Sequence, residues 1–402
     1  MISLSDIQIA ARMIKSNILR TPLVYSPTFS KMTGAEIYLK LENLQRGGSF
    51  KIRGASYKIQ LHLEQVRQNG VVAASVGNHA QGVALAASAA NVPATIVMPT
   101  WTSITKQEAT RNYGAEVILQ GDSLLESIKI GQDLASKSRR LFIHPYDDAD
   151  VTIGQGTIGL EILEEIPDPD WILVPVGGGG LIAGIATGVK TIRPQTQVIG
   201  IQAEACPSAY EALKFGRPVR IENKNSIADA IMVTEVGESD FHILRDKVDK
   251  IILVSEDQIA EAITLLFERK KILAEGGGAV PLAALLGSSL KVPNGHRVVL
   301  VISGGNVDSL VLDKIVRQGL RLHGRLMQLS LCIEDVPGSL ARVLSLIAGY
   351  GANVVHIYHA RNEKGLPIDH TRVELELETR GFDHIEKIKT SMENQGYEIK
   401  MR

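Results

Sequence analysis

Short apolar runs alternate with helix-length segments between about residues 70 and 320. The runs are rich in β-branched residues and apolar on both faces, which is typical of strands buried under helices on both sides. They lie at 71–74, 94–98, 116–119, 171–176, 198–201 and 297–302. Ala- and Leu-rich helices are expected between them, for example at 81–90 and 181–192. Strands that alternate with helices predict βαβ units and a largely parallel sheet, hence an α/β fold.

The pattern changes near residue 325, where a basic, weakly apolar stretch predicts a domain boundary. Beyond it we expect strands at 327–333, 354–359, 371–377 and 397–401, and helices at 339–348 and 384–394. The strand at 371–377 alternates strictly, which places Arg372, Glu374 and Glu376 on a solvent-facing side. The order β-α-β-β-α-β within about 75 residues predicts a ferredoxin-like unit. We therefore expect one domain at 1–322 and a second at 327–402.

Composition is that of an ordinary folded chain of 402 residues. Hydrophobic residues make up 45% of it and the formal charge is -1, so no bulk field attracts nucleic acid or an anionic membrane. The two cysteines, Cys206 and Cys332, cannot build a disulfide framework or a paired-cysteine metal site. The N-terminus lacks the basic segment of a secretory signal, and the apolar runs are too short to span a bilayer. We expect a cytoplasmic protein that binds neither nucleic acid nor membranes.

Glycine is concentrated at the predicted strand ends. Residues 177–180 are four consecutive glycines between a strand and a helix, where backbone N–H groups and a helix N-terminus can hold an anion. Four glycines exceed what a tight turn requires, so a phosphate site is favoured. With Ala183 and Glu204 the loop also satisfies a loose dinucleotide fingerprint, and a nicotinamide-dependent dehydrogenase stays an alternative.

Two more glycine segments carry polar residues. Ser303 to Asn306 follows the run at 297–302, where open α/β sheets bind ligands, although Ser303 could equally be a helix N-cap. Glu275 precedes Gly276, Gly277 and Gly278, and by itself it is better explained as the last residue of a helix than as an acid beside a ligand.

A lysine and an asparagine–histidine turn complete the candidate chemistry. Lys51 follows a glycine turn, and residues 75–82 again join a strand to a helix. Alone, Lys51 would be a surface charge and His79 a structural histidine. Together, one cradle suits a phosphate, a second suits a carboxylate, and a buried lysine can form a Schiff base. Because no metal-ligand cluster and no Ser-His-Asp order is apparent, the set predicts pyridoxal phosphate on Lys51 and an amino-acid substrate.

These segments resemble the motif set of the threonine dehydratases, also called threonine ammonia-lyases: SFKIRGA at 49–55, SVGNHAQG at 75–82, GGGGL at 177–181 and SGGN at 303–306. That family belongs to the tryptophan-synthase-β-like, fold type II pyridoxal phosphate enzymes, and the resemblance spans about residues 5–320. The segment DVPGSL at 335–340 is similar to ACT domains, small modules that typically bind amino acids and pair with each other. The resemblance implies a catalytic domain at 1–322, with large and small open parallel-sheet parts, the small one at about 70–147. It further implies an ACT-like regulatory domain at 327–402.

The resemblance also implies residue roles. Lys51 would hold the cofactor and act as base at the substrate Cα, with Ser303 facing the pyridine nitrogen. Phe50 would pack on the cofactor ring, and Asn78 would bind the ring hydroxyl oxygen. The substrate carboxylate would be received by Ser75, Asn78 and His79. The phosphate would be held by the backbone of Gly177, Gly178, Gly179, Gly180 and Leu181.

The activity implied is β-elimination from L-threonine to 2-oxobutanoate and ammonia, with side activity on L-serine. A serine-preferring dehydratase and an amino-acid sensor with an inactive catalytic body stay alternatives. Val76 stands where related racemases carry a second hydroxyl group, so racemisation is not expected. Ala230 replaces a glycine that relatives often have against the ring. Gln202 and Ser208 replace acids that bind a cation in some relatives, so we expect no metal.

Partners follow from the same resemblance. A homodimer or homotetramer is expected, since oligomers are mostly symmetric. An amino-acid effector is expected at the ACT-like domain, near Asp335, Gly338, Leu340 and Asn353, although a purely structural dimerisation module would fit the sequence equally well. The identity and sign of the effector, and a role in isoleucine biosynthesis or in catabolism, stay open.

Overall fold

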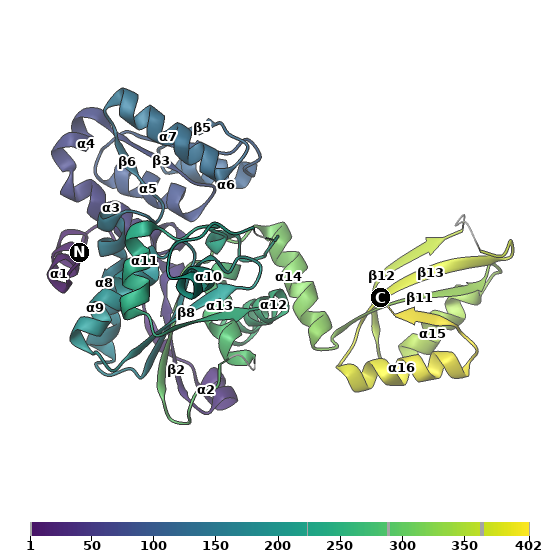
Figure 1. Cartoon of the computed structure of the whole chain (residues 1–402). Helices are drawn as coiled ribbons and strands as arrows, with labels where there is room; N and C mark the ends of the chain where they lie inside the picture. The colour runs from purple at the N-terminus through teal and green to yellow at the C-terminus, as the bar shows by residue number, and fades with distance from the viewer. Residues whose placement is uncertain (1, 223, 288–289, 362–365, 402) are drawn as a thin grey trace. The chain divides into compact units, whose positions relative to one another are not determined.

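The computed structural model describes residues 2–222, 224–287, 290–361 and 366–401 and contains two compact units, Met1–Val311 and Leu312–Arg402 (Figure 1). The division falls inside helix α14 (Ser309–Leu322), at the opposite end of that helix from the sequence-based boundary at 322–327. In the described part of the chain, no helix combines the length and the apolar character needed to cross a membrane.

A six-stranded sheet forms the centre of the first unit, in the order β1-β2-β10-β7-β8-β9. The pair β1–β2 is antiparallel and the other neighbours are parallel, so the carboxyl ends of five strands share one edge. The α/β fold is therefore confirmed. The strands are β1 (Leu23–Tyr25), β2 (Glu36–Leu41), β7 (Trp171–Pro175), β8 (Gln197–Ala203), β9 (Lys250–Val254) and β10 (Arg297–Ile302).

A second, smaller parallel sheet has the order β5-β4-β3-β6. Its strands are β3 (Val71–Ala74), β4 (Ala94–Met98), β5 (Glu116–Leu119) and β6 (Leu141–Ile143). Strands β3 and β4 are buried along their whole length, as their continuous apolar runs predict. The same expectation is wrong for β5, because this strand lies at the sheet edge and its first and last residues are exposed.

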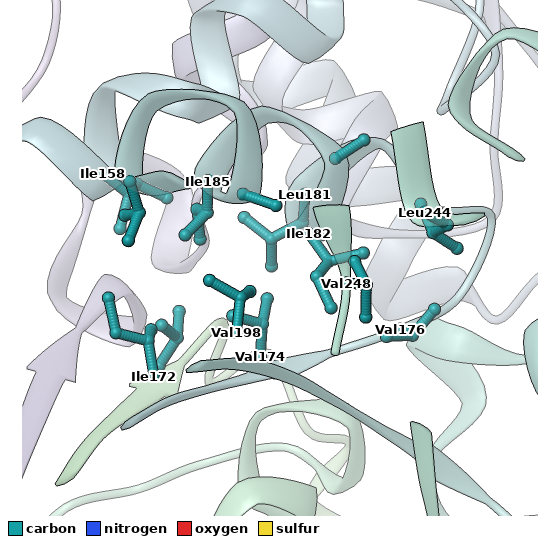
Figure 2. Packing of buried hydrophobic residues seen from close by; sticks show 14 of the residues in the cluster. Ile158, Ile172, Val174, Val176, Leu181, Ile182, Ile185, Val198, Leu244 and Val248 are labelled. Carbon is teal, nitrogen blue, oxygen red and sulfur yellow. The ribbon is translucent and has the colours of Figure 1, made fainter. Parts of the chain in front are cut away.

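Helices cover both sheets (Figure 1). Figure 2 shows the main core, where Ile158 on α8 and Ile182 and Ile185 on α9 face Ile172 on β7 and Val198 on β8. These side chains are fully buried, so this layer fixes the start of α9 relative to the edge of the large sheet. The helices of the first unit are α1 (Leu4–Met13), α2 (Pro27–Thr33), α3 (Lys51–Leu61), α4 (Leu63–Asn69), α5 (Asn78–Ala89), α6 (Ile104–Asn112), α7 (Leu124–Ser138), α8 (Ala149–Glu165), α9 (Gly180–Ile192), α10 (Ser208–Phe215), α11 (Glu238–Lys247), α12 (Glu256–Leu265) and α13 (Gly276–Leu286).

The second unit has the predicted element order β-α-β-β-α-β on an antiparallel sheet, β12-β13-β11-β14. Its elements are β11 (Leu326–Glu334), α15 (Ser339–Gly349), β12 (Asn353–Ala360), β13 (His370–Glu378), α16 (Phe382–Asn394) and β14 (Ile399–Met401). Glu376 was expected on the solvent-facing side of the sheet, but it is buried, with only 6% of its surface exposed. It accepts hydrogen bonds from Arg317 Nη1 at 2.8 Å and Gln328 Nε2 at 2.9 Å, so α14 covers this part of the polar face.

Candidate active site

Helices α5 and α9 of the first unit begin shortly after strands and have no capping side chain. Helix α5 starts after β3 with Gly77 at its N-cap, and α9 starts after β7 with Gly179 at its N-cap. Some other helices of this unit have a side-chain cap, for example α7 from Ser123 and α8 from Asp148, whereas α6, α10, α11 and α13 also lack one. Because the first N–H groups of a helix have no intrahelical partner, the glycine-bordered starts of α5 and α9 can bind anions.

The nine residues predicted to bind a cofactor line one pocket. They are Phe50, Lys51, Asn78, Gly177, Gly178, Gly179, Gly180, Leu181 and Ser303. The glycines are required by close packing as well as by the loop conformation. A Cβ on Gly178 would lie 2.2 Å from Cγ of Tyr146, and Gly179 has a φ of 108°, in the left-handed region that favours glycine. The backbone of this loop is therefore its binding surface.

Lys51 is the first residue of α3, and its amine donates a hydrogen bond to the carbonyl oxygen of Pro145 at 2.7 Å. Burial lowers the pKa of Lys51 to about 8, although the carboxyl groups of Glu275 and Asp240 act in the opposite direction. A lysine of this kind is partly neutral near physiological pH and can act as a nucleophile or base, which a surface lysine cannot do efficiently.

The backbone holds Lys51 opposite Ser303. Ser49 and Gly304 form an antiparallel bridge, and the N–H of Phe50 donates to the carbonyl oxygen of Ser303 at 3.1 Å. Ser303 directly follows β10 and lies six positions ahead of α14, so the helix N-cap alternative for it is wrong. The lysine and the hydroxyl group thus face the same pocket from two segments about 250 residues apart in the sequence.

Glu275 is part of the site, which corrects its assignment as the end of a helix. It precedes α13, is 3% exposed, and its Oε1 accepts a hydrogen bond from Asn78 Nδ2 at 2.7 Å. Burial raises the pKa of Glu275 to about 8. Asn306 completes the network, since its Nδ2 donates to Asn78 Oδ1 at 2.9 Å and to the Gly47 carbonyl oxygen at 2.8 Å. The network fixes the orientation of the Asn78 amide.

A neighbouring compartment contains the predicted substrate turn. Ser75, Asn78 and His79 line it together with Lys51. His79 is buried, and its Nε2 is 2.9 Å from the carbonyl oxygen of Ile143. Burial lowers the pKa of His79 to about 3, so this imidazole is neutral and offers no positive charge to a carboxylate. The anion-binding groups of the turn are therefore the N–H groups at the start of α5.

Sequence reasoning missed several residues around these two compartments. Tyr146 lines both, and Lys106 on α6 pairs with Asp229 at 2.8 Å at the outer end of the second. No local motif marks these positions, because they follow ordinary turns or lie on solvated helices. The positions compared with a cation site, Gln202 and Ser208, are hydrogen-bonded to each other at 3.2 Å.

The second unit has a hollow of its own, around the turn after β11. Asp335, Gly338 and Leu340 line it together with His359 and Arg361. Asn353, predicted to belong with them, is not among the lining residues, because it begins β12 at the far end of that strand from His359. The structure therefore brings together three of the four residues predicted here.

Comparison with known proteins gives a consistent result. Residues 14–304 match the family model described as "Pyridoxal-phosphate dependent enzyme". An L-threonine ammonia-lyase of Thermotoga maritima is 46% identical over 401 residues, covering 100% of both chains. A solved threonine deaminase from T.th. is 42% identical, with a TM-score of 0.72 over 76% of this chain and 99% of that one. A maize serine racemase is 33% identical, with a TM-score of 0.74 over 80% of this chain and 98% of that one.

The residues of the pocket fit pyridoxal phosphate. The loop at 177–180 offers backbone N–H groups in a space that a side chain on Gly178 would obstruct, Lys51 has a lowered pKa, and Ser303 offers a neutral hydroxyl group. The glycine loop is therefore compatible with a pyridoxal phosphate site, and the comparisons lend no support to the dehydrogenase alternative. The chain belongs to the pyridoxal-phosphate dependent enzymes, with the fold type II architecture and pyridoxal phosphate as its cofactor.

Proposed function

We propose that this chain is an L-threonine ammonia-lyase, which converts L-threonine to 2-oxobutanoate and ammonia and acts on L-serine as a side activity. The observation that carries the proposal is the position of Lys51, an amine of lowered pKa between two uncapped helix N-termini. The full-length similarity to the Thermotoga maritima L-threonine ammonia-lyase supports the same assignment.

Pyridoxal phosphate, when bound, supplies an electron sink for negative charge at the substrate Cα. The backbone of Gly177–Leu181 would hold its phosphate, and the start of α5 would hold the substrate carboxylate. Asn78, oriented by Glu275 and Asn306, would present its amide to the cofactor ring. The neutral Lys51 amine would take the proton from Cα, and return of that proton to the leaving β-hydroxyl would let it depart as water. Uptake of one water would then release 2-oxobutanoate and ammonia.

Two residues favour elimination over racemisation. Ser303 faces the pocket with a neutral hydroxyl group, and a neutral partner does not hold a pyridine nitrogen protonated as a carboxylate would. Negative charge then stays closer to Cα, where it expels the β-hydroxyl. Val76 lines the substrate compartment, and its aliphatic side chain has no proton to deliver to the substrate.

The test is a panel of L-amino acids assayed by release of keto acid, on protein whose cofactor is followed by its visible absorption. We expect turnover of L-threonine with a higher kcat/KM than of L-serine. Lys51→Ala should lose both the absorption band and turnover, whereas Lys137→Ala, at an exposed position on α7, should keep both. Activity and colour retained in Lys51→Ala would refute the proposal, and a ratio favouring L-serine would make the chain a serine dehydratase.

We further propose that the second unit binds an amino-acid effector, as in a regulatory ACT-like domain, and that the enzyme is a symmetric homo-oligomer. The support is the hollow at Asp335, Gly338 and Leu340, where Arg361 Nε lies 3.4 Å from Asp335 Oδ1, so that charges of both signs are present for a zwitterion. Isoleucine and valine should change the activity of the full chain and leave a shortened chain ending near residue 326 unaffected. If neither protein responds, only a structural role is left for this unit.

A further inference from the structure

A buried acid, Asp240, stands against the glycine loop of the cofactor site. It lies in the first turn of α11 and is 1% exposed. A Cβ on Gly179 would come 3.0 Å from Asp240 Cβ, and one on Gly180 would come 3.3 Å from Asp240 Oδ2. The carboxyl group is therefore packed directly against the two glycines at which α9 begins.

Only one of the two carboxyl oxygens has a partner. Thr152 Oγ1 donates a hydrogen bond to Oδ1 at 3.0 Å, whereas Oδ2 is buried and has no hydrogen-bond partner among the described residues. A buried carboxyl oxygen left alone is costly, so native proteins rarely leave one without a proton or a ligand beside it. Of the two carboxyl oxygens of Asp240, Oδ2 is the nearer to the Cβ position of Gly180, on the loop whose backbone suits a phosphate.

The charges around Asp240 favour its neutral form. Burial raises the pKa of Asp240 well above its ordinary value, and the carboxylates of Asp147 and Asp148, ahead of α8, raise it further. Thr152 and the Lys51 amine act in the opposite direction. The first turn of α9 has no ionisable side chain, so its N–H groups are what it offers to an anion. An ionised Asp240 and a phosphate would therefore share one helix N-terminus.

We propose that Asp240 is a titratable part of the phosphate cradle, whose protonated form is favoured further when the cofactor phosphate occupies the loop at 177–180, so that phosphate binding takes up one proton from water at any pH where Asp240 of the empty site is ionised. The reason is mutual repulsion, since two anions beside the same buried N–H groups cannot both be stable. Protonation of Oδ2 also removes the unpartnered buried charge. The proposal depends on the cofactor and on the placement of its phosphate, and not on the threonine activity.

The test compares pyridoxal phosphate with pyridoxal, which lacks the phosphate group, as ligands of the full-length apoenzyme between pH 7 and 9. The ratio of their dissociation constants isolates the phosphate, because the Lys51 amine contributes to both. In the wild-type protein we expect the advantage of pyridoxal phosphate to fall as pH rises, by up to about tenfold per pH unit for one linked proton. In Asp240→Asn, whose side chain does not titrate, the ratio should be independent of pH.

Asp147→Asn is the matched control, because Asp147 is a neighbouring acid that accepts from the Ser239 N–H at 3.3 Å and does not contact α9 in the way Asp240 does. It should keep a pH-dependent ratio. A ratio independent of pH in the wild type, or an unchanged slope in Asp240→Asn, would overturn the proposal. If Asp240→Asn does not fold, Thr152→Val serves instead. Loss of the Thr152 hydroxyl, which donates to Oδ1, should move the pH range in which the ratio of dissociation constants falls to higher pH. If that range does not move, the proposal is overturned.

Discussion

The two anion cradles that we propose for this enzyme use the same element, an uncapped helix N-terminus after a parallel strand, in different ways. The cradle before α9 consists of glycines, and the walls at Tyr146 and Asp240 leave no room for a side chain on Gly178 or Gly179. The cradle before α5 carries Ser75, Asn78 and His79, and a Cβ on Gly77 would meet nothing within 4 Å. The first arrangement suits a resident group held by backbone alone, and the second suits a ligand that must enter and leave.

The largest effect on binding should come from adding a methyl group to the closely packed cradle before α9. Gly178→Ala places a Cβ against the Tyr146 ring, and overpacking of about 1–3 kcal/mol should weaken cofactor binding by roughly 5- to 150-fold. Visible absorption during titration with the cofactor measures this loss. Gly77→Ala, in the open cradle, should leave cofactor binding nearly unchanged; equal losses in both variants would abolish the distinction between the cradles.

Glu275 lines both compartments and accepts a hydrogen bond from Asn78, and its pKa of about 8 makes stability depend on pH. The carboxyl is neutral in the folded protein up to that pH but ionises near 4.5 when unfolded, so stability should fall between about pH 4.5 and 8 by at most 1.4 kcal/mol per pH unit. Glu275→Gln should remove this part of the decline. Thermal unfolding of both proteins at pH 6, 7 and 8 measures it, and parallel curves would contradict the assignment.

The open cradle should respond to loss of a single hydroxyl group. Ser75 Oγ accepts a hydrogen bond from the Gly77 N–H at 3.1 Å and so shapes the turn. In Ser75→Ala the KM for the amino acid should rise by up to about tenfold, the value of one hydrogen bond. Cofactor absorption should not change, because the glycine loop is untouched. A loss of absorption instead of a rise in KM would mean that the turn also holds the cofactor.

The smallest effect is expected outside both cradles, at the ion pair of Lys106 with Asp229. Both side chains are partly exposed, so Lys106→Ala should change KM by less than about fivefold, and the difference should shrink at high salt. Arg111→Ala is the control, since it removes an ion pair with Glu108 on the same helix, away from the pocket. A larger change in Lys106→Ala would give this lysine a direct part in substrate binding.

Strand and helix positions follow from the sequence where one physical pattern dominates. Strands β3, β4 and β10 coincide with their apolar runs because a strand covered on both faces contains few polar residues. Strand β2 was not recognised because it carries Lys40, which is fully buried only because Glu161 pairs with it at 2.6 Å. That partner is 121 residues away in the sequence, and no local pattern predicts the pairing.

In the candidate site, too, residues marked by a local sequence pattern were predicted, and residues whose role depends on distant neighbours were not. The order of strands and glycine segments was enough to indicate the pocket and Lys51, because carboxyl ends of parallel strands meet at one edge and consecutive glycines expose backbone N–H groups. Glu275 was assigned to a helix end because its role depends on Asn78, which lies 197 residues away at the start of helix α5. Gly278 is required because the backbone packs closely at this point, where a Cβ would lie 2.5 Å from the carbonyl oxygen of Gly304.

The sequence by itself determined the α/β class, the lysine and the two strand-end cradles, because periodicity and glycine runs act locally and leave a readable pattern. The tertiary structure alone decided which acids are buried beside these cradles, as Glu275 and Asp240 are, and that Glu376 is buried in the second unit. The physical reason is that the ionisation and hydrogen bonding of a carboxyl group depend on what surrounds it in space, and those neighbours come from distant parts of the chain.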